Sequence, residues 1–491
     1  MLKKKFVYPV GIAILLFAIV PIFAQSDRRS VELRPCEVPG AEPNTRESVL
    51  CGKLVVFEDR TRRTGRKIPI NIVVYPATSA DKAPDPIFYI PGGPGSSATE
   101  DAPYIVKEMA KLRPNRDLVF VDQRGTGGSN PLNCELFDPK DIHSYLGHWN
   151  PPAAVKACRA ALEKTADLKL YVTSIAMDDL EEVRKALGYG KINLFGASYG
   201  TRAVMAYVKQ HGPSVRSVLL HCVSTFDQFM PLEFPWHTQR ALNGVLDECL
   251  SDAGCGTKFP DIKKNERAVL ETLKKGPVEV DVVVDGKPVR VKLSRNLAGE
   301  AIRYALYQSG NAARVPILLN EAANGNFKRM AEAAIFYRRR LVATGATGLY
   351  LAITCAEDLP FAKRVPGRDP DATFLGDYRL REQLEACAEW PQSTLRKNYD
   401  ELVGSDVPAL IYSGQWDPVT PPEYGDRLAK LLPNSLHVIV PSGGHGFSGL
   451  TGLDCLQNLT TSFFQQGSTR GLDTSCVKSI KRRGFALSPG K

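Results

Sequence analysis

The sequence predicts an α/β protein with a mostly parallel central sheet, helices on both faces and an inserted, mainly helical segment. Short apolar runs alternate along the chain with segments of helical periodicity, which is typical of parallel sheets with crossover helices. Several runs are continuously apolar, as strands buried on both faces usually are. The series of runs stops after residue 222 and resumes at residue 408, which indicates an insertion between two strands.

The predicted strands follow these apolar runs. They cover residues 53–57, 69–75, 86–90, 117–122, 191–195, 215–222, 408–413 and 436–440. A helix is predicted before the 191–195 strand, because apolar residues recur there at helical spacing. Ser174 is its expected N-cap, Asp178 and Asp179 suit its positive end, and Gly188 is expected to end it.

Residues 226–395 differ from the rest of the chain. Their pattern is mostly helical, with one hairpin expected at Asp285-Gly286 between two β-branched runs. The 491 residues correspond to about three average domains. The order of elements instead favours one core, residues 25–225 and 396–491, with residues 226–395 as a helical cap.

The N-terminus indicates export. Lys3, Lys4 and Lys5 precede an apolar run from Phe6 to Ala24, which predicts a secretory signal peptide at residues 1–24 and a periplasmic or secreted protein. The alternative is an uncleaved anchor helix, but the run is short and contains prolines. Cleavage would therefore leave no stable membrane anchor.

Composition and charge exclude several classes of protein. With 43% hydrophobic and 24% charged residues, the chain is not collagenous, disordered or a multi-span membrane protein. Removal of the three N-terminal lysines lowers the formal charge from +10 to +7. The short basic run 478–483 is typical of a solvated tail, so nucleic acid is not an expected partner.

Eleven cysteines are compatible with export, because oxidising compartments permit disulfides. Ten of them form pairs that are adjacent in sequence, although connectivity does not follow from sequence alone. The hypothetical pairs are Cys36/Cys51, Cys134/Cys158, Cys249/Cys255, Cys355/Cys387 and Cys455/Cys476. Cys222 remains and is interpreted as a small buried hydrophobe. The lack of CxxC and HExxH motifs gives no support for a metal site.

A G-x-S-x-G motif at residues 196–200 predicts a nucleophilic serine, Ser198. The motif alone is weak, and the alternative is an ordinary glycine-rich turn. Its context strengthens it, because an apolar strand precedes it and a helical pattern follows. A nucleophile elbow needs this strand–turn–helix order, in which the flanking glycines permit a tight turn.

A serine nucleophile needs a base and an orienting carboxylate, which follow it in chain order in this type of fold. His445, in a glycine-rich loop after the last predicted strand, is the expected base, whereas His437 lies within that strand. Asp417 follows the preceding strand and is the expected acid. Asp426 is the alternative, but it falls in a helical stretch.

The tetrahedral intermediate also needs hydrogen-bond donors for its oxyanion. The backbone N–H of Tyr199, next to the nucleophile, is the expected first donor. Gly93, in the glycine-rich loop after the 86–90 strand, is the expected second donor. A phosphate-binding loop is not supported, because no Gly-Lys-Ser/Thr follows.

Five motifs, in this order, resemble the secreted tripeptidyl aminopeptidase and proline iminopeptidase branch of the α/β-hydrolases. They cover residues 91–96, 122–129, 196–202, 417–421 and 443–446. The resemblance implies an α/β-hydrolase fold, serine hydrolysis near the free N-terminus of peptides and a helical cap. It also implies a triad of Ser198, Asp417 and His445, and no cofactor. Pro91 stands where proline iminopeptidases carry a histidine, which favours the tripeptidyl-type branch.

The acidic pair Glu357-Asp358 resembles a family segment that faces the cleft, and it could hold the substrate's N-terminal amine. The alternative is a structural or solvated pair. The expected function is thus an exported aminopeptidase-type serine peptidase. An esterase on the same triad and a catalytically dead binding module are the rival hypotheses, and the sequence does not determine the oligomeric state or the cleavage preference.

Overall fold

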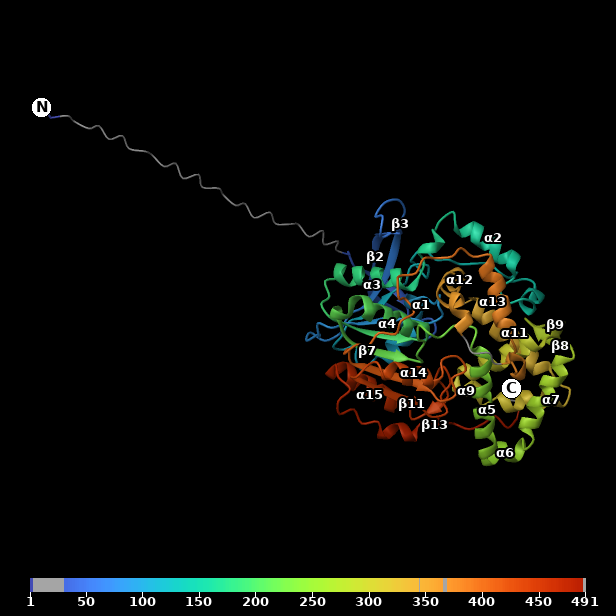
Figure 1. The fold of residues 1–491 in the computed structure, drawn as a ribbon. Coiled ribbons are helices and arrows are strands. Elements are labelled where there is room, and N and C mark those ends of the chain that lie inside the picture. Colours follow the sequence, from blue (N-terminus) through green and yellow to red (C-terminus); the bar gives the residue numbers. More distant parts are fainter. Residues whose placement is uncertain (3–30, 344, 365–368, 489–491) are drawn as a thin grey trace.

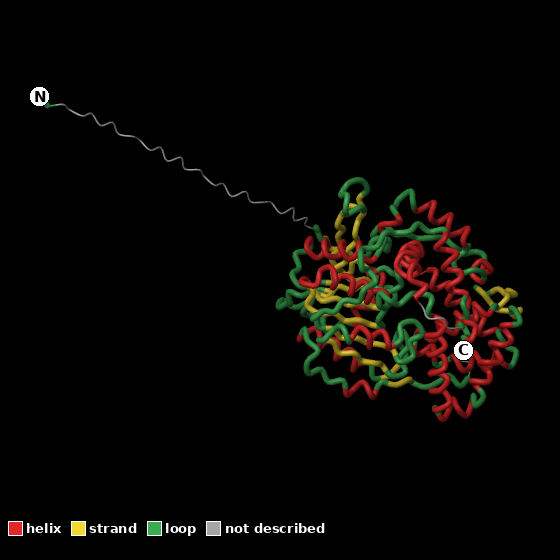
Figure 2. The backbone as a smooth tube through the Cα atoms, in the orientation of Figure 1, coloured by secondary structure: helices red, strands yellow, loops and turns green. Residues whose placement is uncertain are grey.

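A computed structural model describes residues 1–2, 31–343, 345–364 and 369–488. Its centre is a nine-stranded sheet with the order β1-β2-β3-β5-β4-β6-β7-β10-β11 (Figures 1 and 2). The strands of this sheet are β1 (Arg34–Pro39), β2 (Arg46–Phe57), β3 (Lys67–Tyr75), β4 (Ile87–Ile90), β5 (Leu118–Val121), β6 (Ile192–Ala197), β7 (Val215–His221), β10 (Ala409–Gly414) and β11 (Ser435–Val440).

The sheet is parallel from β5 to β11 and antiparallel from β1 to β5. Every residue of β4, β5 and β10 is buried, as the continuous apolar runs predicted. The prediction of a mostly parallel sheet is confirmed. Strand β1 was not predicted; it is an edge strand that contains two prolines, which an edge tolerates because it has unpaired N–H positions.

Helices cover both faces of the sheet, and alternate strand residues contact different helices. Phe88 packs in one apolar cluster with helices α3, α4 and α14, and its neighbour Tyr89 packs in another with α1 and α15. This alternation follows from the two-residue period of a strand. The helices outside the inserted segment are α1 (Ala98–Glu108), α2 (Pro152–Leu162), α3 (Thr173–Ala186), α4 (Tyr199–His211), α14 (Pro422–Ala429) and α15 (Asp454–Gln466).

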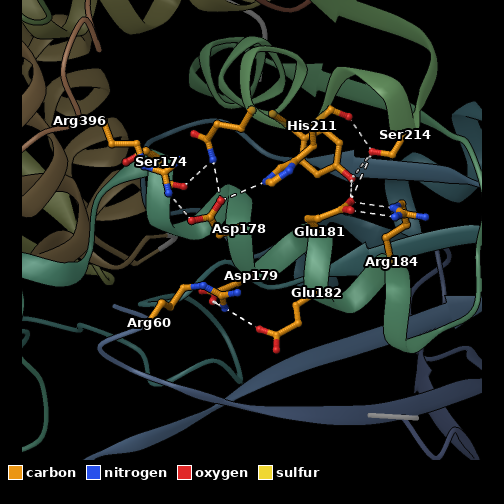
Figure 3. Close-up of polar contacts among 12 residues, drawn as sticks. Arg60, Ser174, Asp178, Asp179, Glu181, Glu182, Arg184, His211, Ser214 and Arg396 are labelled. Carbon is orange, nitrogen blue, oxygen red and sulfur yellow. Dashed lines mark hydrogen bonds and ion pairs between the residues drawn. The ribbon is translucent and has the colours of Figure 1, made fainter. Parts of the chain in front are cut away.

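Hydrogen bonds join α3 to the end of α4 and to the turn that follows it (Figure 3). Asp178 accepts hydrogen bonds from His211 at 3.1 Å and from Arg396, and Glu181 accepts one from Ser214 at 3.4 Å. Asp179 lies in a buried pair with Arg124 at 2.6 Å. Asp178 and Asp179 therefore bind side chains, beyond any interaction with the helix dipole. The N-cap prediction was wrong, because α3 begins one residue before Ser174.

The chain between β7 and β10 is mostly helical and lies to one side of the sheet (Figure 1). The predicted hairpin is present as β8 (Val278–Val284) and β9 (Lys287–Leu293), and Asp285 and Gly286 both have positive φ at its turn. The helices here are α5 (Phe234–Ser251), α6 (Ala253–Lys258), α7 (Ile262–Lys274), α8 (Arg295–Tyr307), α9 (Ser309–Ala312), α10 (Val315–Ala323), α11 (Lys328–Ala343), α12 (Thr347–Ile353) and α13 (Tyr378–Ala388).

This helical segment has two kinds of core. Helices α5, α7, α8, α10 and α11 pack with the hairpin in a cluster of their own. Helices α12 and α13 instead pack into the apolar cluster that contains Phe88 of the large sheet. The boundaries at residues 226 and 395 stay a prediction. The described chain returns to this segment near its end, where Arg482 of the two-residue strand β13 (Lys481–Arg482) pairs with Glu248 of α5 at 3.1 Å.

All five hypothetical cysteine pairs are disulfides in the structure. Cys222 is free and buried, as expected. Within the described parts of the chain, no helix has the length and apolarity needed to cross a membrane. The predicted signal peptide lies, apart from its first two residues, outside the described residues.

Candidate active site

Ser198 occupies a tight turn between β6 and α4. Its φ of 55° and ψ of −124° are strained for a residue with a side chain. A Cβ on Gly200 would lie 2.1 Å from the carbonyl oxygen of Ile90, so this position needs glycine. The Ser198 N–H donates to the carbonyl of His221 at 2.8 Å. The motif therefore forms the strand–turn–helix that a nucleophile elbow requires.

His445 and Asp417 form a hydrogen-bonded pair. His445 Nδ1 lies 2.8 Å from Asp417 Oδ2, and Asp417 is fully buried. Asp417 also accepts hydrogen bonds from the Val419 N–H at 2.8 Å and from the Thr420 N–H and hydroxyl at 2.9 and 2.8 Å. Burial favours the neutral acid, but His445 and these donors outweigh it and hold the pKa of Asp417 below its ordinary value. Asp417 is therefore an ionised carboxylate that orients the imidazole.

The alternative pair, His437 and Asp426, is also hydrogen-bonded, at 2.9 Å. His437 Nε2 even lies 2.9 Å from the hydroxyl of Ser413. However, Ser413 is fully buried within β10 and lines none of the described cavity around Ser198. This second Ser-His-Asp arrangement therefore offers no space for a substrate.

Gly93 lies in the loop after β4. This loop packs against Ser198. A Cβ on the neighbouring Gly92 would come within 3.0 Å of the Ser198 Cβ. The φ of Gly93 is 109°, a conformation that favours glycine. Tyr199 is the first residue of α4, so its N–H has no partner inside the helix. Both predicted oxyanion donors thus belong to segments that meet at Ser198.

Ser198, His445 and Gly93 line one cavity of about 540 Å³. The helical segment supplies much of its wall, including Phe234, Tyr304, Tyr307 and Tyr350. Tyr307 packs edge-on against the His445 ring, with 5.0 Å between ring centroids. A cavity of this size accommodates a short peptide or another small acyl substrate.

Two families match separate parts of the chain. Residues 85–246 match the family described as "alpha/beta hydrolase fold", and residues 372–476 match the "TAP-like protein" family. The first match contains Ser198, and the second contains Asp417 and His445. The chain thus combines an α/β-hydrolase fold with a TAP-like C-terminal region. The family resemblance seen in the five motifs is therefore confirmed.

Three curated relatives are similar to this TAP-like hydrolase. The serine protease Hip1 of Mycobacterium tuberculosis (strain ATCC 25618 / H37Rv) is 27% identical over 483 residues, which cover 91% of each chain. The tripeptidyl aminopeptidase of Streptomyces coelicolor is 22% identical over 498 residues, 92% of this chain and 87% of the relative. The proline iminopeptidase of Neisseria gonorrhoeae is 26% identical over 136 residues, 28% of this chain and 31% of the relative.

In this TAP-like hydrolase, Glu357 and Asp358 do not reach the cavity. Both are fully buried and absent from its lining. Glu357 accepts hydrogen bonds from the N–H of Thr173 at 2.7 Å, from its hydroxyl at 2.8 Å and from the Tyr399 hydroxyl. Asp358 forms an ion pair with Arg202 of α4 at 2.8 Å. The expectation that they contact a substrate amine has to be corrected, because both carboxyl groups are buried outside the cavity lining and bond to other side chains.

Sequence reasoning missed Asp101, an acidic residue in the cavity wall. It lies in α1, directly after the loop that carries Gly93. Burial raises the pKa of Asp101 to about 6, although the Tyr89 hydroxyl donates to it at 3.2 Å. Its helical neighbourhood carries no motif, so only the packing of α1 against the cavity could reveal it.

Cys222 also lies in the cavity wall, next to the His445–Asp417 pair. Its Sγ lies 3.2 Å from the His445 carbonyl oxygen, and its sulfur and the ligand atoms of Asp417 and His445 lie within 4.8 Å of one another. These three groups could in principle ligate a metal. However, burial raises the pKa of the Cys222 thiol, which disfavours the thiolate that a metal needs. Asp417 and His445 are also already bonded to each other.

Proposed function

We propose that this chain is an exported serine peptidase that cleaves peptides near a free N-terminus, of the tripeptidyl or prolyl aminopeptidase type. One observation carries the proposal: Ser198 on its strained turn and His445, which is bonded to Asp417, line one cavity. The names of the relatives, serine protease and tripeptidyl aminopeptidase, support peptides as the substrate class.

In the first half of the reaction, Ser198 Oγ attacks the scissile carbonyl carbon, and His445 Nε2 takes the hydroxyl proton. Asp417 accepts from His445 Nδ1–H and stabilises the imidazolium. The N–H groups of Gly93 and Tyr199 donate to the developing oxyanion. When the carbon–nitrogen bond breaks, the leaving amine takes the proton from His445.

In the second half, water attacks the ester that joins the acyl group to Ser198. His445 takes a proton from this water and returns it to Ser198 Oγ as the ester bond breaks. The products are the N-terminal fragment with a new carboxylate and the regenerated hydroxyl. Neither half uses a cofactor or a metal in this mechanism.

Recognition of the N-terminus requires a group that attracts an ammonium ion. Asp101 is our candidate, because it is an acidic residue in the lining of the cavity that contains Ser198. The helical segment acts as a cap, since its aromatic side chains form much of the cavity wall and Tyr307 packs against the His445 ring. A covered cavity favours chain ends over internal loops of folded proteins.

Export is proposed from residues 1–24 and is supported by the five disulfides, which persist in oxidising compartments. Expression with the intact N-terminus in a bacterial host tests it. N-terminal sequencing is expected to show that the exported protein begins at Gln25. A membrane-bound product that retains residues 1–24 would contradict this part of the proposal.

Two measurements on the mature protein test the activity. A fluorophosphonate probe is expected to label the wild type and not the Ser198→Ala variant. Mass spectrometry of a peptide library is expected to find N-terminal fragments released from free peptides and far less from acetylated ones. A protein that reacts with the probe and hydrolyses esters but not peptides would be an esterase. A protein that does not react with the probe would be a binding module.

A further inference from the structure

Three arginines from different helices line the cavity that contains Ser198. They are Arg303 of α8, Arg338 of α11 and Arg379 of α13. Their exposed fractions are only 1%, 4% and 5%. Burial of a guanidinium is costly unless its charge is compensated, so three of them at one wall require an explanation.

The three guanidiniums are held in place by aromatic rings. Arg338 and Arg379 lie over the ring of Trp149, with 4.0 and 3.8 Å from each guanidinium carbon to the ring centroid. Arg303 lies over Tyr304 at 4.3 Å, and Tyr304 stacks on Trp149. Stacking covers the faces of a guanidinium and leaves its N–H edges for planar acceptors such as carboxylates. We call these five residues the arginine stack.

The internal acids compensate the arginine stack only in part. Glu300 accepts from Arg303 Nη2 at 2.7 Å and lies 3.8 Å from Arg379 Nε. It also accepts from the Tyr378 hydroxyl. Arg338 donates to a backbone carbonyl, that of His148, at 2.7 Å. Burial, together with the charge of Arg379, lowers the pKa of Arg338 to about 10.

Several N–H groups of the arginine stack have no acceptor. Within the described chain, no hydrogen-bond acceptor meets Nε or Nη1 of Arg379 or Nε of Arg338, although these atoms are buried. A buried donor without a partner is destabilising, because it loses its hydrogen bonds to water without replacement. A ligand oxygen in the cavity would remove this cost, and a carboxylate would also compensate the charge.

A single side chain, that of Tyr307, connects the arginine stack to His445. Arg303 Nη1 donates to the Tyr307 hydroxyl at 3.0 Å, and the ring of Tyr307 contacts the His445 ring. A substrate at Ser198 therefore extends toward the arginines within the same cavity. Glu300, their internal partner, does not line this cavity.

We propose that the arginine stack is a subsite for a carboxylate of the substrate, so that the enzyme prefers peptides that carry an acidic group. This inference rests on the proposed peptidase function. The carboxylate can come from an Asp or Glu side chain or from the C-terminus of a short peptide. In both cases the carboxylate is a planar acceptor for the guanidinium N–H groups of Arg338 and Arg379.

Binding to the Ser198→Ala variant tests the subsite without turnover. Calorimetry compares tripeptide amides that contain Glu or Gln at each position in turn, and a Gln tripeptide with a free or amidated C-terminus. The first comparison tests the side-chain source and the second tests the C-terminal source. We expect about tenfold tighter binding in at least one comparison, because charge-assisted hydrogen bonds are stronger than neutral ones.

Replacement of Arg379 is the second part of the test. Adding Arg379→Gln to Ser198→Ala is expected to bring the affinity ratio close to one. Adding Arg381→Gln, which removes an equal charge from an exposed position of the same helix, is expected to preserve it. Equal binding of all acidic and neutral pairs to the Ser198→Ala protein would overturn the proposal, even if the Arg379 variant fails to fold. Absence of peptide cleavage by the wild type would instead refute the peptidase function.

Discussion

The carboxylate of Glu357 accepts a hydrogen bond from the backbone N–H of Thr173 at 2.7 Å and so caps helix α3 from a distant part of the chain. The first N–H groups of a helix have no partner inside it, and a carboxylate there is favourable for hydrogen bonding and for the helix dipole. The Thr173 hydroxyl in turn lies 2.7 Å from the Tyr199 hydroxyl, next to the nucleophile. Glu357 therefore stabilises the turn that carries Ser198 through Thr173 and Tyr199, without lining the cavity.

Replacement of Glu357 by Ala is expected to lower the free energy of unfolding by about 3 kcal/mol, because it leaves buried donors on Thr173 and Tyr399 without an acceptor. Chemical denaturation measures this change. The KM values for free and acetylated peptides are expected to change by the same factor. A selective rise in KM for free peptides would instead indicate that Glu357 contacts the substrate amine.

Asp358 and Arg202 are expected to behave as a coupled pair. Either Asp358→Ala or Arg202→Met is expected to cost about 3–5 kcal/mol of stability, since each leaves one charge buried without its partner. The double variant is expected to cost clearly less than the sum. A double-mutant cycle of unfolding free energies measures the difference, and strictly additive effects would show that the ion pair does not couple the helical segment to α4.

The substitution Asp417→Asn is expected to lower kcat by about 10⁴-fold with little change in fold, because the amide cannot hold His445 in the required tautomer. Asp426→Asn is the matched control, since it alters the His437 pair and leaves the cavity unchanged. Steady-state kinetics and circular dichroism of both variants provide the measurement. A comparable loss of kcat in Asp426→Asn would reject Asp417 as the specific acid.

The affinity for free-amine peptides is expected to depend on the ionisation of Asp101. Its pKa of about 6 means that the carboxylate is charged above pH 6 and protonated below it. KM is therefore expected to rise as the pH falls below 6 for free peptides and to stay flatter for acetylated ones. In Asp101→Asn the two KM profiles are expected to be parallel. The neighbouring Glu100→Gln variant, which lacks a cavity position, serves as the control. It is expected to keep the difference between free and acetylated peptides but to move it to lower pH, because the Glu100 charge helps to raise the pKa of Asp101.

Much of the fold could be predicted because its signals are local. The apolar runs at residues 86–90 and 408–413 have the length and composition of buried strands, and β4 and β10 lie there. The G-x-S-x-G pattern predicted the turn at Ser198. The need for Gly196 is local, because a Cβ there would meet Gly200 and Val204, whereas Gly200 is required by the distant Ile90. The disulfides join cysteines that are neighbours in sequence, so the hypothetical pairing agrees with the structure, although sequence order alone does not fix connectivity.

The sequence by itself thus determined the parallel part of the sheet and the turn that presents Ser198, and it suggested the disulfide pairs that the structure contains. Only the tertiary structure decided the direction of Glu357, the approach of Cys222 to His445 and the convergence of three arginines on Trp149. These features depend on which faces of distant helices meet, and an acidic or basic residue has the same local pattern on a solvated face as on a buried one. Long-range packing selects between the two, because a buried charge is stable only where another part of the chain, or a substrate, supplies its partner.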